Sequence, residues 1–295
     1  MREAKTIDLL LLILLGVIWG SAFFNIKIAT YSYEPFTLAL VRVVFASIPL
    51  FILCKYKNIK IEAFTKNWKP YALIGLCNIT IPFILIAIGT NKINSYLAAI
   101  LMSTTPLSGS ILAHFFTKDD RFTIPKLISI CIGFVGVLFI FEIDSFFNVT
   151  SSNSIQLLSK LLIILAALGY MISNIVAYNT LKHIDSFSIT FFATFFGALV
   201  SVPFLIASEI SYPSTISFES VLPILYLGFF PTAIAFQLRY HITKTSGPVF
   251  LSYVAYLIPI FAIIWGYILL SENINYTSII GIILILFGVY VGRKN

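Results

Sequence analysis

Ten stretches of mostly apolar residues follow one another along this chain, with only short polar segments between them. Most are close to the ~20 residues that a helix needs to cross a bilayer. Apolar residues make up 59% of the chain and charged residues 11%, whereas a soluble domain is roughly one quarter charged. Because every backbone polar group in lipid needs a partner inside the protein, these stretches are expected to be helices. The sequence predicts an all-α integral membrane protein.

Charged and turn-forming residues bound the ten expected transmembrane helices. Their expected ranges are Ile7–Ile28, Pro35–Cys54, Tyr71–Gly89, Ser95–Phe116, Ile124–Phe141, Gln156–Tyr178, Ser186–Ser208, Val221–Tyr240, Pro248–Leu270 and Tyr276–Val291. The first range follows Arg2 and Lys5 but has no clear small-x-small cleavage site, so we interpret it as an uncleaved span.

Basic residues are distributed unevenly between the two sides of the expected bundle. With a cytoplasmic N-terminus, fifteen of the 19 Lys and Arg residues lie in cytoplasmic segments. Only Lys27, Lys92 and Lys160 lie outside, and Arg42 lies within a span. Cytoplasmic loops of membrane proteins carry the excess of basic residues, so we expect both termini in the cytoplasm and the protein in the cell (inner or plasma) membrane. This placement also argues against nucleic-acid binding, despite a net charge of +7.

The two halves of the chain resemble each other at an offset of about 151 to 153 residues. The matched pairs are Trp19 with Tyr170, Gly75 with Gly228, Pro106 with Pro259, and Asp119 with Glu272. Each half has five expected spans, an odd number, so the halves would enter the membrane in opposite directions. We therefore expect two inverted five-helix repeats, 1–145 and 156–295, an architecture typical of secondary transporters.

Several short motifs, in a specific order, resemble the EamA-type members of the drug/metabolite transporter superfamily. The motifs are Gly16–Ser21 with Lys27, Arg42–Ala46, Ala87-Ile88 before Asn94–Ala99 and Pro106, and Ser271-Glu272 with Gly281 and Gly288. The chain departs from the family pattern at Lys118-Asp119, where Gly-Glu is usual, and at Ser271, which replaces Gly. The resemblance implies a central cavity lined mainly by the first, third, fourth, sixth, eighth and ninth helices.

The resemblance implies a secondary transporter of small polar metabolites, either amino acids or amino-acid-like and nucleoside-containing compounds such as S-adenosylmethionine. A membrane-embedded lipid-modifying enzyme is the alternative, but it needs clustered carboxylates or histidines. Asp119-Asp120 is the only acidic pair, and the three histidines are scattered. There is no Walker motif and no metal-ligand spacing of cysteines. We expect a non-enzyme without cofactor or metal, whose partners are a small-molecule substrate and the bilayer, as a monomer or a homodimer.

Polar and aromatic residues within the spans are the candidate substrate-binding residues. Trp19 and Tyr170 occupy equivalent positions and would flank a substrate or pack helices together. Amides inside spans either contact substrate or bridge helices, and hydroxyls near a proline face a cavity or bond their own backbone. The candidates are Trp19, Asn78, Ser103, Tyr170, Asn174, Gln237, Tyr253 and Tyr256, with helix kinks at Pro106 and Pro259.

Charge within the spans bears on both binding and energy coupling. Arg42 is the one charge clearly inside a span, where it either serves function or bonds polar groups between the first two helices. No Asp or Glu lies deep in any span. Because proton-driven transporters often use a buried carboxylate, this absence favours facilitated diffusion or exchange.

Overall fold

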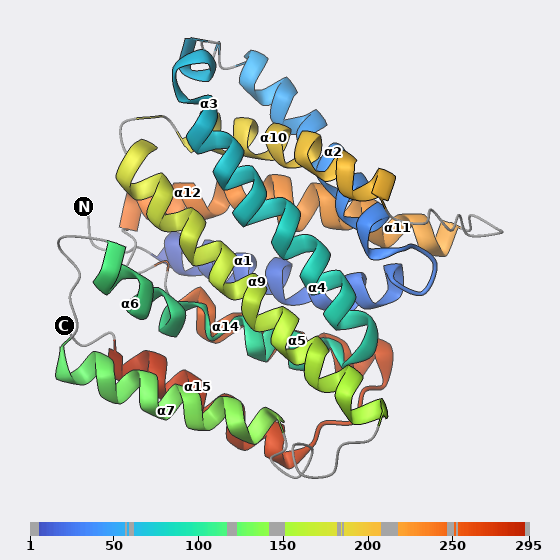
Figure 1. Ribbon diagram of the computed structural model, residues 1–295, viewed down its shortest axis with the longest axis vertical. Helices are drawn as coiled ribbons and strands as arrows, with labels where there is room; N and C mark the ends of the chain where they lie inside the picture. Colours follow the sequence, from blue (N-terminus) through green and yellow to red (C-terminus); the bar gives the residue numbers. More distant parts are fainter. Residues whose placement is uncertain are drawn as a thin grey trace.

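The computed structural model describes residues 6–56, 58, 62–116, 123–141, 151–181, 184, 186–207, 218–246, 251 and 253–292. These residues form helices and no strand (Figure 1). In chain order the helices are α1 (Thr6–Ala29), α2 (Pro35–Tyr56), α3 (Glu62–Ile74), η1 (Gly75–Thr80), α4 (Ile81–Lys92), α5 (Ser95–Met102), α6 (Thr105–Phe116), α7 (Ile124–Phe141), α9 (Ser151–Leu181), α10 (Ser186–Ala207), α11 (Phe218–Leu227), η2 (Gly228–Ile234), α12 (Ala235–Ser246), α14 (Val254–Leu270) and α15 (Tyr276–Gly292).

Among the described residues, seven helical stretches are long and apolar enough to cross a membrane, and three shorter helices are equally apolar. The predicted all-α membrane fold is therefore confirmed at this level. Most helix ends lie close to the predicted ones. The exceptions include α3, which begins at Glu62 rather than Tyr71, α9, which begins at Ser151 rather than Gln156, and α12, which continues to Ser246 rather than ending at Tyr240. The predicted start of the ninth helix, Pro248, lies outside the described residues, as does Asp119.

The stretch Ser95–Phe116 is not one continuous helix. α5 ends at Met102, Ser103 and Thr104 form a turn, and α6 begins at Thr105. Pro106, the second residue of α6, has no N–H to donate to the Met102 carbonyl. The Thr105 hydroxyl donates to that carbonyl instead. The second predicted kink residue, Pro259, lies inside α14, which runs without interruption from Val254 to Leu270.

Two spans contain a π-helical segment, η1 and η2, each beginning at a glycine. π-helical turns are rare and occur often at functional sites. In η2, Pro231 cannot donate to the Leu227 carbonyl, and the Thr232 hydroxyl donates to it at 2.9 Å. In both η2 and α6, a hydroxyl next to a proline thus bonds the carbonyl four residues before that proline.

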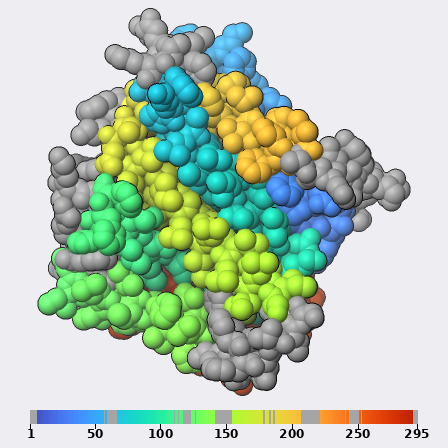
Figure 2. All heavy atoms as spheres, in the orientation of Figure 1, coloured from blue at the N-terminus to red at the C-terminus, as the bar shows by residue number. Residues whose placement is uncertain are grey.

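The helices pack in pairs along the bundle. α7 contacts α15 at one edge, α2 contacts α10 at the opposite edge, and α1 contacts α14 between them (Figure 1). In the space-filling view, α9 runs diagonally across one face, between α6 and α4, both of which it contacts (Figure 2). Many large apolar side chains are exposed on the outer surfaces of the helices, as Phe134 and Ile283 are, which suits contact with lipid.

Candidate functional site

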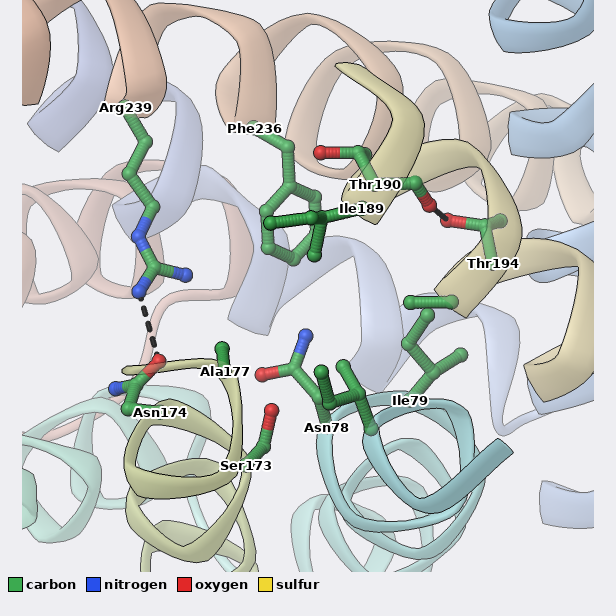
Figure 3. Close-up of a pocket in the computed structure, with 12 residues that line it drawn as sticks. Asn78, Ile79, Ser173, Asn174, Ala177, Ile189, Thr190, Thr194, Phe236 and Arg239 are labelled. Atoms are coloured by element: carbon green, nitrogen blue, oxygen red, sulfur yellow. Dashed lines mark hydrogen bonds between the residues drawn. The ribbon is translucent and has the colours of Figure 1, made fainter. Parts of the chain in front are cut away.

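A small polar cavity lies where η1 and the end of α3 meet α9, α10 and α12 (Figure 3). The space that the centre of a water molecule can occupy in it is about 20 Å³, little more than one ordered water requires. Isoleucine and alanine side chains and the ring of Phe236 form the apolar part of the wall. Its polar members are Asn78, Ser173, Asn174, Thr190, Thr194 and Arg239.

Arg239 and Asn174 join two helices across this cavity. The guanidinium of Arg239 extends from α12, and its Nη2 donates a hydrogen bond to Asn174 Oδ1 on α9 at 2.9 Å (Figure 3). The Asn174 amide nitrogen lies 3.7 Å from Met171 Sδ, a weak acceptor. Arg239 is thus the charged residue of the cavity wall, and a neutral amide oxygen accepts its hydrogen bond there.

Asn78 and Ser173 point into the same cavity from η1 and α9 (Figure 3). Asn78 is 8% exposed and Ser173 is 2% exposed, so both are more than nine-tenths buried. Neither side chain hydrogen-bonds to any other described residue. Because buried polar groups nearly always have a partner, this pair of open polar groups is suited to a ligand or water.

Trp19 lies one layer behind the cavity wall. Its indole Nε1 donates to the Pro231 carbonyl of η2 at 3.1 Å. Its ring meets that of Phe236 edge-on, with 6.4 Å between centroids. The residue therefore connects α1 to η2 and supports the aromatic part of the wall, but it does not itself line the cavity.

Arg42 is buried between α2, η2 and α4. Its Nε donates to Thr232 Oγ1 at 3.0 Å, and its guanidinium carbon lies 3.8 Å from the centre of the Phe83 ring. The predicted structural alternative placed its contacts between the first two helices, whereas these two contacts run to the eighth and third spans. Tyr170 is half-buried between the two larger apolar clusters.

The other predicted residues lie outside the cavity. The Ser103 hydroxyl donates to the Ile100 carbonyl of its own helix at 2.6 Å. The ring centroids of Tyr253 and Tyr256 are 6.5 Å apart. Both amide atoms of Gln237 are buried without a hydrogen-bond partner among the described residues. Of the eight predicted substrate-binding residues, the structure brings Asn78 and Asn174 together at the cavity.

Besides Ser173, Thr190 and Thr194, Arg239 is a polar cavity residue that the sequence did not single out. It falls near the end of a predicted span and was counted with the cytoplasmic charges. α12 continues to Ser246, so Arg239 lies well inside a helix. Its position within the predicted span Val221–Tyr240 was the signal that could have marked it as a residue inside the bundle. No group of three or more His, Cys, Asp or Glu residues suited to a metal occurs in the described part of the chain.

A second buried polar cluster lies near the C-terminal end of α1. The Glu272 carboxylate accepts hydrogen bonds from the backbone N–H groups of Ser95 and Tyr96 at 2.6 and 3.3 Å. Lys27 Nζ donates to the carbonyls of Asn91 and Ile93 at 3.0 and 2.9 Å. These contacts join the C-terminal ends of α1, α4 and α14 to the start of α5.

Comparisons with known proteins agree with the fold. A model of the EamA-like transporter family matches residues 6–142 and 157–292. The chain is 22% identical over 275 residues to the uncharacterized transporter YoaV of Bacillus subtilis (strain 168), covering 93% of this chain and 92% of the relative. It is 24% identical over 282 residues to an uncharacterized transporter of Archaeoglobus fulgidus, covering 96% of each.

A solved crystal structure resembles the chain with a TM-score of 0.68 and 16% identity, covering 98% of both chains. At this identity the likeness shows the fold alone. The family model, in contrast, matches most of the chain and confirms the resemblance carried by its motifs. The protein is a multi-pass membrane protein with the general role of a transporter, and it belongs to the EamA-like transporter family.

Proposed function

We propose that the protein is a secondary transporter of small polar metabolites, amino acids or amino-acid-like and nucleoside-containing compounds, that works by alternating access. The observation that carries the proposal is the cavity. Asn78 reaches it from the first half of the chain, and Asn174 and Arg239 reach it from the second. A polar site between two halves opens to either side in turn when the halves rock against each other.

The two halves, 1–145 and 156–295, are in this proposal inverted five-helix repeats. Helices in equivalent positions pair with each other: α2, the second span of the first half, contacts α10, the second span of the other half. The fifth spans, α7 and α15, likewise contact each other. A pseudo-twofold axis in the membrane plane would pass between equivalent helices, and the two matches to the family model also support the division.

Close backbone contacts at η1 and η2 support the same symmetry. A Cβ atom added to Gly75 would lie 2.8 Å from the carbonyl oxygen of Ala193, and one added to Gly228 would lie 2.8 Å from the carbonyl oxygen of Arg42. Both pairs of equivalent residues, Gly75 with Gly228 and Arg42 with Ala193, are offset by about 151 to 153 residues. The same contact is therefore made twice, with the halves exchanged.

Both termini are cytoplasmic and the protein lies in the cell membrane in this proposal, on the evidence of the Lys and Arg distribution. In that orientation the cavity lies in the cytoplasmic half of the bundle, near the end of α9 and the start of α10. The second polar cluster, which contains Glu272 and Lys27, then lies at the outer end of the bundle, next to the start of α5. The conformation corresponds to an inward-facing or occluded state.

Exchange or facilitated diffusion is the mode of transport that we propose. The described acidic residues, Asp8, Glu34, Glu62, Glu219 and Glu272, all lie at or near helix ends. None of them lines the cavity. A carboxylate that carries a proton along with the substrate would be expected close to the site.

Uptake into proteoliposomes tests the proposed function. The purified full chain is reconstituted and offered a labelled panel of amino acids, nucleosides, S-adenosylmethionine, sugars and organic acids, with and without a pH gradient. We expect saturable uptake of one class of solute that does not require the gradient. If protein-free liposomes take up every solute equally well while the protein converts a labelled lipid into a product, the lipid-modifying enzyme replaces the transporter.

A further inference from the structure

We propose that the cavity between η1, α9, α10 and α12 binds the carboxylate group of the substrate, through Arg239 together with Asn78 and Ser173. The proposal rests on the proposed transport function and names the chemistry that the transporter recognises. It makes Arg239 a substrate-binding residue and Asn174 a residue that helps to hold the guanidinium in the absence of substrate.

The hydrogen bond of Arg239 inside the cavity is one that a carboxylate can replace. Its Nη2 donates at 2.9 Å to the amide oxygen of Asn174, which carries no charge. A hydrogen bond from guanidinium to carboxylate is roughly twice as strong as one between neutral groups, and it is often bidentate. The hydrogen bonds from Arg239 to a bound carboxylate are therefore stronger than its hydrogen bond to the Asn174 amide.

Asn78 and Ser173 supply the remaining donors. Both are buried, both point into the cavity, and neither hydrogen-bonds to another described residue (Figure 3). The amide of Asn78 offers two N–H donors and the hydroxyl of Ser173 offers one. An ionised carboxylate has about four lone-pair positions, so three separate donor groups around it leave little of its hydrogen-bonding capacity unused.

The charge of the surroundings favours an anion over a cation. The described cavity wall contains Arg239 and no carboxylate. Arg42 places a second buried guanidinium in the bundle. A substrate ammonium group would find no acidic partner in the described wall, so the amino group of an amino acid is dispensable for binding.

The apolar residues of the wall determine which chemical groups suit the part of the ligand beyond its carboxylate. Ile74, Ile79, Ile189 and Phe236 surround the polar groups, which suits a small carboxylate with an aliphatic body. The cavity has room for little more than one water molecule in this conformation. Its wall comes from both halves of the chain, so the motion that alternating access requires also widens the site.

A matched set of four probes separates the two charged groups of an amino acid. Leucine carries both groups, isovalerate carries only the carboxylate on a chain one methylene shorter, isoamylamine carries only the amine, and leucinamide carries an amine with a neutral amide. Their binding to the purified full chain is measured in detergent as the concentration-dependent rise of the melting temperature. We expect leucine and isovalerate to raise it with saturation, and leucinamide and isoamylamine to leave it unchanged.

Variants then assign the effect to Arg239. In R239Q we expect the apparent affinity for isovalerate to fall at least tenfold, whereas R239K retains part of it because it keeps the charge without the bidentate geometry. K69Q removes one positive charge from an exposed position of α3 outside the cavity, and we expect wild-type affinity. Melting temperatures without probe establish that each variant is folded.

Three results would overturn the assignment: equal binding of amines and carboxylates, no stabilisation by either carboxylate, or unchanged isovalerate affinity in R239Q and R239K. Parallel exchange assays keep this apart from the proposed function. Exchange of solutes without preference for a carboxylate would support the transport function and contradict the carboxylate site. Carboxylate binding by a protein that exchanges no solute removes the transporter and leaves the site.

Discussion

The Glu272 carboxylate binds both polar groups of Ser95, accepting from its backbone N–H at 2.6 Å and from its hydroxyl at 2.9 Å. Ser95 is the first residue of α5, so a carboxylate that follows α14 caps a helix from the other half of the chain. Negative charge at a helix N-terminus is favourable, because the first N–H groups have no partner within the helix. Gly266 leaves room for this contact, since a Cβ there would lie 2.5 Å from Glu272 Oε2.

Replacing this cap should destabilise the protein. We expect E272A to lower the stability by about 1–3 kcal/mol, because it leaves buried N–H groups of α5 without their acceptor. E272Q should lose less, since it keeps an oxygen acceptor without the charge. Melting temperatures of the purified variants check this order. E34A, at another acidic residue near the same end, is the control, and a loss as large in E34A as in E272A would contradict the capping role.

Thr232 holds two buried groups through one hydroxyl, donating to the Leu227 carbonyl and accepting from Arg42 Nε. The substitution T232V keeps the shape but leaves both groups without this partner, at a cost of about 1–3 kcal/mol for each group left unsatisfied. T232S restores the hydroxyl and should melt close to the wild type. Equal melting temperatures for T232V and T232S would show that the hydroxyl does not support η2.

The positions of the helices could be predicted from the sequence because they depend on a property of single segments, a run of apolar residues long enough to cross a bilayer. Asn78 and Asn174 were candidates for a related reason, since amides inside such runs stand out. Ser103 was a candidate too, but its hydroxyl bonds the Ile100 carbonyl one turn earlier. Sequence alone does not distinguish an open hydroxyl from one satisfied by its own helix.

The role of Arg239 could not be predicted by the same reasoning. A basic residue near the end of an apolar run is normally a loop charge, and its depth depends on how far α12 extends beyond that run. The π-helical geometry of η1 and η2 was also not predictable, because it arises from the packing of Gly75 and Gly228 against the backbone of neighbouring helices. The glycine match between the halves showed the positions but not the geometry.

These two glycines should tolerate alanine poorly. In G75A the new methyl group would meet the backbone nitrogen of Gly197 at 2.7 Å, and in G228A it would meet the backbone oxygen of Arg42 at 2.8 Å. Backbone atoms held in helices cannot move aside easily, so we expect low yields of folded protein for both. In the control G109A the methyl group would meet the end of the flexible Met171 side chain. If G109A is the least stable of the three, backbone contact is not the deciding factor.

Trp19 should influence transport indirectly, because it supports the wall of the cavity. We expect W19A to slow uptake while membrane insertion stays normal, because it removes both the hydrogen bond to Pro231 and the contact with Phe236. W19F keeps an aromatic ring and should be intermediate. Y256A is expected to slow uptake as well, on the prediction that Tyr256 contacts substrate. Uptake per correctly inserted molecule is the measurement, and wild-type rates would remove either residue from the transport path.

Counterflow in proteoliposomes tests most directly whether one site in this protein opens to the two sides of the membrane in turn. Liposomes containing the full chain are loaded with an unlabelled solute that the protein takes up, and the entry of the same labelled solute is followed without any ion gradient. The account predicts that internal solute accelerates entry and produces a transient accumulation that protein-free liposomes lack. Entry that is independent of internal solute, for every member of the panel, would contradict it.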